Sequence, residues 1–129
     1  MMYIRFIVKS LDPDSGRRQG LFQASGTLRE AGLLSEDEEE QLTGLNKWFN
    51  KELKEPDSFS RSRKRHAKKV ALSWFKDTAR HHIAKMHEYA NILKAHGVRI
   101  EVIRAERPGY IVYEDEFQVV AEPFSETET

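Results

Sequence analysis

Residues 61–69 are the part of this sequence whose residue types point most directly to chemistry. They carry six Lys and Arg side chains and no acid, and two aromatic residues, Trp74 and Phe75, follow. The cations are Arg61, Arg63, Lys64, Arg65, Lys68 and Lys69. Lys and Arg neutralise backbone phosphates, and an exposed aromatic ring can stack on an unpaired base. The segment therefore predicts a surface for nucleic acid or another polyanion, with Trp74 as the stacking residue.

Acidic blocks elsewhere in the chain offer a second explanation for these cations. Residues 110–129 carry six acids and no Lys or Arg, and residues 36–40 are acidic throughout. The totals balance, at 21 Lys+Arg against 21 Asp+Glu, whereas nucleic-acid-binding domains usually have a basic excess. We therefore expect the basic segment to face an acidic counterpart, within the fold or on a second subunit. Nucleic-acid binding is the alternative.

A further candidate site, for phosphate or another anion, follows the first predicted strand. Gly16, Arg17 and Arg18 lead into a predicted helix, and the N–H groups of a helix N-terminus can hold an anion. The spacing matches neither the P-loop nor the dinucleotide-binding motif. These three residues are a candidate anion site on residue type alone.

Four histidines fall on one predicted helix, at His81, His82, His87 and His96. Metal ligands on a helix share a face when they are three or four residues apart, and no pair here has that spacing. The chain also has no cysteine, which excludes thiolate metal sites. We therefore expect no metal and no cofactor, and His82 is a candidate only for a pH-sensitive contact.

The spacing of apolar residues predicts the elements that position these groups. Residues 3–9 alternate as in a half-buried strand. Ser35 and Glu38 form a capping box at the start of a helix that runs to Lys54. Apolar residues at steps of three and four predict a longer helix over 65–96, ended by Gly97. The remaining expected elements are a helix over 17–33 and strands over 98–104, 110–113 and 116–121.

This order, β-α-α-α-β-β-β, predicts an α+β fold in the form of a two-layer sandwich. We expect a mostly antiparallel four-stranded sheet with the helices packed on one face. The last three strands would form a meander, and the first strand would join it. At 129 residues the chain is one domain by size. We assign residues 1–122 to that single domain and residues 123–129 to a flexible acidic tail.

Composition also narrows the location of the protein. No apolar run approaches the ~20 residues that a membrane-spanning helix needs, and the apolar start of the chain is too short for a signal peptide. The absence of cysteine favours a reducing compartment. We therefore expect a cytoplasmic protein with no membrane partner.

Three stretches of the chain resemble a recurring family of short, uncharacterised bacterial proteins. They are GLFQASGTLREAGLLS over 20–35, SWFKDTARHHIAKM over 73–86 and RPGYIVYEDEFQVVAEPF over 107–124. The last stretch follows the pattern RPGYxVYEDExQVVAEPF. The resemblance spans most of the chain, but it implies no activity, ligand or catalytic residue.

Three functions are compatible with these observations. The leading hypothesis is a non-catalytic interaction or regulatory module that uses charge-segregated surfaces, as a homodimer or with another protein. The second is a nucleic-acid-binding regulator that uses the basic segment. The third is a small enzyme with a cleft between sheet and helices, near His82, Tyr89 or Arg17. No nucleophile–base set is visible in the sequence, so no catalytic residue is assigned.

Overall fold

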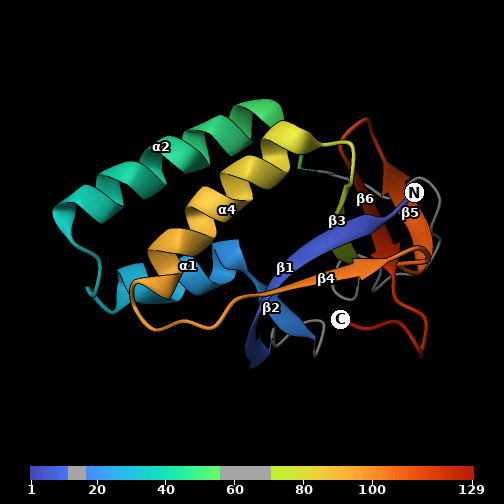
Figure 1. Ribbon diagram of the computed structural model, residues 1–129, viewed down its shortest axis with the longest axis horizontal. Helices are drawn as coiled ribbons and strands as arrows, with labels where there is room; N and C mark the ends of the chain where they lie inside the picture. Colours follow the sequence, from blue (N-terminus) through green and yellow to red (C-terminus); the bar gives the residue numbers. More distant parts are fainter. Residues whose placement is uncertain (12–16, 56–70) are drawn as a thin grey trace.

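The computed structural model describes residues 1–11, 17–55 and 71–129, and the structural statements below concern those residues. They form an α+β fold with one antiparallel sheet of six strands instead of the expected four. Figure 1 shows the helices grouped together beside the sheet. No helix in these ranges is long and apolar enough to cross a membrane. The elements in chain order are β1 (Tyr3–Leu11), β2 (Arg18–Gly20), α1 (Leu21–Glu30), α2 (Glu36–Glu52), β3 (Leu72–Lys76), α4 (Arg80–Lys94), β4 (Glu101–Ala105), β5 (Tyr110–Glu114) and β6 (Gln118–Glu122).

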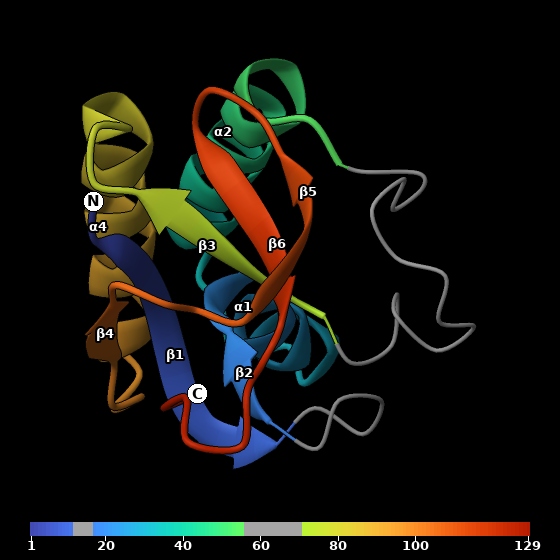
Figure 2. The ribbon, with the colours of Figure 1, turned by 90° about the vertical axis from the view of Figure 1, so that its right-hand side faces the viewer.

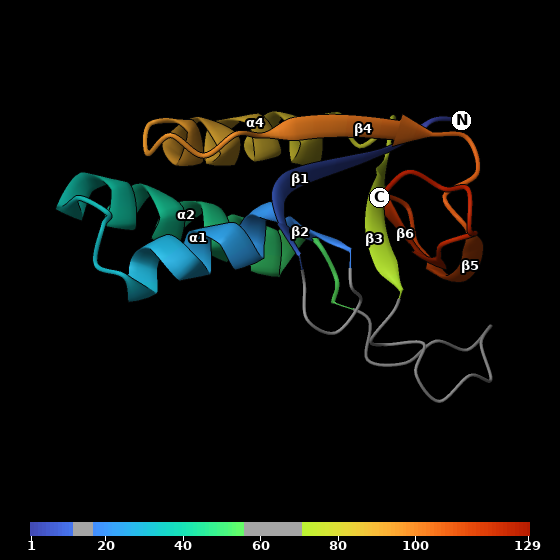
Figure 3. The same ribbon diagram turned by 90° about the horizontal axis from the view of Figure 1, so that it is seen from below.

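Strand β1 is the strand around which the sheet is built. One of its edges pairs with β4. The opposite edge pairs with β3 at Tyr3 and Ile4, and further along with β2 at Ile7 and Leu11. Figure 3 shows β4 on one side of β1, and β2 and β3 on the other. Because the ladder with β3 ends at Ile4 and the ladder with β2 begins at Ile7, the two neighbours of β1 part around residues 5–6.

Two expectations are wrong: the meander of the last three strands and the length of the helix over 17–33. The last three strands do not form a meander, because β4 pairs with β1 and only β5 and β6 pair with each other. The helix expected over 17–33 is shorter, because Arg18–Gly20 forms β2 and α1 begins at Leu21. β1 gains a partner on its second half from this short strand.

The long helix expected over 65–96 is wrong over residues 72–79, and its expected start at 65–70 lies outside the described residues. Residues 72–76 form β3, and α4 begins only at Arg80. The apolar spacing was misleading because Leu72, Phe75 and Ala79 are buried in a strand and a turn, as they would be on the inner face of a helix. A short buried strand and a buried helical segment share such a pattern.

Both faces of β1 are covered, since every residue from Ile4 to Val8 is buried. Ile4, Phe6 and Val8 face the helices. Ile7 faces a second cluster, formed with Leu72, Trp74, Ile103 and Val119. Figures 2 and 3 show β3, β6 and β5 running crosswise to β1 and β4. The helices therefore pack on one face as expected, while the sheet curls over its own other face instead of leaving a plain two-layer sandwich.

Residues 123–129 lie beside β1 and β2 (Figure 2). Arg5 Nη1 donates to the carbonyl of Thr129 at 2.8 Å. Arg18 Nη2 lies 3.6 Å from the Glu128 carboxylate, and the Arg107 guanidinium lies 5.2 Å from the centre of the Phe124 ring. The segment thus has specific contacts, and its expected flexibility stays a prediction.

Helix α2 begins with the expected capping box. Ser35 Oγ accepts from the N–H of Glu38 at 3.2 Å, and Glu38 Oε1 accepts from the N–H of Ser35 at 2.9 Å. His96 Nε2, just beyond α4, lies 2.8 Å from Glu38 Oε2. The hydrogen bond from Ser35, followed by that from His96, holds the pKa of Glu38 below its usual range. Glu38 therefore ties the start of α2 to the end of α4.

We expect Glu38→Gln to lower stability at neutral pH and to flatten the loss of stability in acid. A carboxyl with a depressed folded-state pKa contributes stability that is present above its unfolded pKa, roughly 4.3. That contribution is lost as the pH falls through the lower, folded-state pKa. Urea unfolding at neutral pH and at roughly pH 3 measures the effect. Glu40→Gln, at an exposed position of the same helix, is the control, and equal effects of the two variants at neutral pH would contradict the assignment.

Candidate functional site

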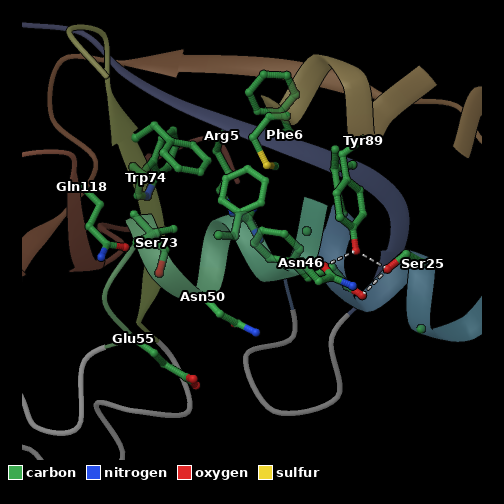
Figure 4. Close-up of a pocket in the computed structure, with 18 of the residues that line it drawn as sticks. Arg5, Phe6, Ser25, Asn46, Asn50, Glu55, Ser73, Trp74, Tyr89 and Gln118 are labelled. Carbon is green, nitrogen blue, oxygen red and sulfur yellow. Dashed lines mark hydrogen bonds between the residues drawn. The ribbon is translucent and has the colours of Figure 1, made fainter. Parts of the chain in front are cut away.

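A cavity of about 650 Å³ lies between the helices and the sheet, where β2 and β3 part. Both the helices and the sheet contribute residues to its walls. Helix α1 contributes Phe22, Ser25, Gly26 and Arg29. Helix α2 contributes Asn46, Phe49 and Asn50, and Leu53 follows at its C-cap. The other walls include Arg5 and Phe6 of β1, Ser73, Trp74 and Phe75 of β3, Met86 and Tyr89 of α4, and Gln118 of β6. Figure 4 shows these side chains around the cavity.

Aromatic rings form much of the cavity wall. Phe22 lies edge-on to both Phe49 and Tyr89, with ring centroids 5.2 Å apart in each pair. The centroids of Phe49 and Tyr89 are 6.5 Å apart. Phe49 and Tyr89 are buried, whereas Phe22 is 43% exposed and lies where the wall meets solvent. The cavity is therefore apolar and aromatic inside, with one ring at its edge.

Three polar side chains form a hydrogen-bonded relay at one end of the cavity (Figure 4). The hydroxyls of Ser25 and Tyr89 are 2.6 Å apart, and Tyr89 donates to Asn46 Oδ1 at 3.1 Å. Each hydroxyl carries one proton. If Tyr89 gives its proton to Asn46, Ser25 must give its own to Tyr89, sharing it with the Phe22 carbonyl at 2.9 Å. The relay then leaves the amide N–H groups of Asn46 as donors.

The hydroxyl of Tyr89 stays protonated in this environment. Burial raises the pKa of Tyr89, and this outweighs the lowering by the hydrogen bonds of Ser25 and Asn46 and by the charge of Arg29. Arg29 lies one helical turn after Ser25 on α1 and also lines the cavity. Arg29 Nε has an ion pair with Glu39 at 3.8 Å, in which both side chains are about half exposed (44% and 50%). A salt bridge that is this exposed contributes little to the stability of the fold.

Gln118 and Asp115 hold the sheet side of the cavity in place. Gln118 Nε2 donates to the carbonyl of Lys54 at 2.6 Å and to Asp115 Oδ2 at 3.1 Å. Burial pulls the pKa of Asp115 upward, but hydrogen bonds from Phe117, Gln118 and Tyr113 outweigh it and leave that pKa below its usual range. The β5–β6 hairpin is thereby fixed to the end of α2.

His82, on α4, contacts the same end of α2. It is buried, and its Nε2 lies 2.7 Å from the carbonyl of Glu52. A carbonyl only accepts, so Nε2 carries the proton. His82 is not among the residues that line the cavity. Its place is structural, next to the rings of Trp48 and Phe117 at centroid distances of 4.9 and 4.3 Å.

The candidate polyanion surface falls mostly outside the described residues. Arg61, Arg63, Lys64, Arg65, Lys68 and Lys69 all lie there. Trp74 is described, and its expected position on an exposed helix is wrong: it is on β3 and 1% exposed. Its buried Nε1 has no acceptor among the described groups. Trp74 thus cannot stack on a base without a change in fold, and instead forms part of the core and of the cavity wall.

The candidate anion site is only partly described, since Gly16 lies outside the described residues. Arg18 is on β2 and not at a helix N-terminus. Its Nη1 lies 2.9 Å from Glu101 Oε2, in addition to the pair with Glu128. Arg17 and Arg18 do not line the cavity. Anion binding here stays a prediction from the sequence, with Arg18 already next to two carboxylates.

The described ranges contain no cluster of three or more side chains suited to hold a metal ion. Comparison with known proteins gives no information on this site. Searches against family models, curated proteins and solved structures gave no match.

We expect Tyr89→Phe to lower the free energy of unfolding by about 1–2 kcal/mol, because it leaves Ser25 and Asn46 without their shared partner. Tyr3→Phe is the matched control, since the hydroxyl of this partly buried residue has no hydrogen bond to the part of the chain that the structure describes. Urea unfolding at neutral pH compares the two variants. If Tyr89→Phe is no less stable than Tyr3→Phe, the relay does not contribute to folding.

Proposed function

We propose that this protein is a non-catalytic binding module that holds a small organic molecule in the cavity between its helices and sheet. The observation that carries the proposal is the cavity itself, about 650 Å³ with six aromatic residues in its wall. Cavities of roughly 300–1,000 Å³, mostly apolar with a few polar groups, are typical of small-molecule sites. The relay of Ser25, Tyr89 and Asn46 provides those polar groups here.

Catalysis is the weaker proposal because the lining residues lack the necessary groups. Among the described residues that line the cavity there is no histidine, and Glu55 is the one carboxylate. Ser25 has Tyr89 and a carbonyl as its partners, neither of which is a general base at neutral pH. Of the residues considered for an enzyme, Tyr89 lines the cavity, while His82 and Arg17 do not.

The two charge-based functions stay proposals beside this one. Binding of a partner protein or a second copy depends on where the basic segment lies, and that segment is outside the described residues. Two acids of the block over 36–40 already have internal partners: Glu38 with His96, and Glu39 with Arg29. Nucleic-acid binding through residues 61–69 would be measured by fluorescence anisotropy with oligonucleotides at two salt concentrations.

Gly26→Leu should abolish binding in the cavity without unfolding the protein. An added Cβ at Gly26 would meet no heavy atom within 4 Å, and Gly26 lines the cavity, so a leucine there occupies ligand space. Gly44→Leu is a matched control, because Gly44 is also helical and uncrowded but does not line the cavity. Both changes replace a helical glycine and should raise helix stability by up to about 1 kcal/mol.

NMR titration with 3-phenylpropionamide, a neutral aromatic probe, measures this. The side-chain signals of Asn46 and Asn50 and the indole N–H of Trp74 should shift on saturation, and Trp48→Phe assigns the indole signal because the chain has two Trp. We expect wild type and Gly44→Leu to bind alike and Gly26→Leu to bind at least about tenfold more weakly, a difference near 1.4 kcal/mol. Equal binding by all three proteins would place the probe elsewhere and contradict the proposal.

A further inference from the structure

The groups at the polar end of the cavity restrict what kind of molecule can lie there. We infer that the cavity is a site for a small aromatic carboxylate, with its ring among Phe22, Phe49 and Tyr89 and its carboxylate beside Arg29 and Asn46. This inference rests on the proposed function and specifies the class of molecule for the same site.

The aromatic part follows from the geometry of the wall. Phe22, Phe49 and Tyr89 lie mutually edge-on at centroid distances of 5.2–6.5 Å. Aromatic rings favour edge-to-face and offset contacts at 4.5–7 Å, so a further ring can join such a cluster with the same geometry. Phe22, exposed at the edge of the cavity, gives an entering ring its first contact.

The carboxylate follows from an excess of donors at the same end. The relay uses the carbonyl oxygen of Asn46 as the acceptor for Tyr89. The remaining groups of Asn46 there are N–H donors, and the guanidinium of Arg29 has only donors. These donors favour a bound group that accepts hydrogen bonds.

The charge of the cavity wall selects an anion over a neutral acceptor. Among the described residues of the wall, the ionisable side chains, tyrosine apart, are the cations Arg5, Arg29 and Lys54 and the acid Glu55. Arg29 lies one helical turn after Ser25 on α1 and lines the cavity, so its charge is on the side of the wall where the relay lies. The described wall thus has more cations than acids, and the pair of Arg29 with Glu39 is exposed and weak. This charge favours a carboxylate over an ammonium group.

Two probes that differ only in charge test this inference. The amide 3-phenylpropionamide and the acid 3-phenylpropionate share ring and chain, and both would be titrated by NMR at neutral pH and low salt. Wild type should prefer the carboxylate about tenfold, as expected for one charge-assisted hydrogen-bonded pair. The preference should shrink as salt is added.

Variants of Arg29 identify the source of the preference. Arg29→Gln should weaken binding of the carboxylate far more than binding of the amide, so that the two probes bind within about twofold of each other. Arg29→Lys should retain part of the preference. Arg80→Gln is the matched control, because it removes one charge from an exposed residue that does not line the cavity. An equal affinity of wild type for both probes, or a preference that survives Arg29→Gln, would overturn the carboxylate inference and leave the proposed function standing. Binding of neither probe would count against both.

Discussion

The burial of β1 on both faces is the constraint on which the rest of this structure depends. Ile4, Phe6 and Val8 need the helices to cover them, and Ile7 on the other face needs a second cover. A simple sheet with helices on one face would leave Ile7 and Trp74 in water. Instead, the sheet curls, and β3 and β6 cover the second face of β1. A residue such as Ile7, with no exposed surface, gains roughly 1.5–3 kcal/mol from that closure.

The curl also explains why a cavity exists. Because β3 turns away from β1 after Ile4, the next stretch of that edge is left to β2, which begins to pair only at Ile7. The space between the two strands is flanked by the inner faces of α1 and α2. The end of α2 is fixed by His82 and Gln118, which bind the carbonyls of Glu52 and Lys54. The cavity is thus held open by the same contacts that position the second helix, and not by loose packing.

The sequence predicted those features that depend on local signals. β1 alternates, and the Ser35–Glu38 capping box defines the start of α2, so both were predicted from a few neighbouring residues. β3 was missed because Trp74 and Phe75 lie between apolar residues at helical spacing. This segment is a strand because it pairs with β1 and β6, and that pairing is not visible in the local sequence. The third hypothesis includes a cleft between sheet and helices near Tyr89, but Ser25 and Asn46 were missed because they look like ordinary helix residues. Their one signal was that each lies beside the apolar stripe of its helix, where a polar side chain needs a partner.

The hydrogen-bonded partners of Ser25 and Asn46 bear on function more than on folding. A polar side chain in an apolar wall contributes little net stability even when it is hydrogen-bonded, and apolar residues of similar shape are often as stable. A core selected for packing alone has no need of a serine, an asparagine and a tyrosine that meet one another beside phenylalanines. Their relay uses the acceptor oxygen of Asn46 and leaves the amide N–H groups of Asn46 as donors. The relay therefore favours a site for a molecule that accepts hydrogen bonds over a core that has merely tolerated polar residues.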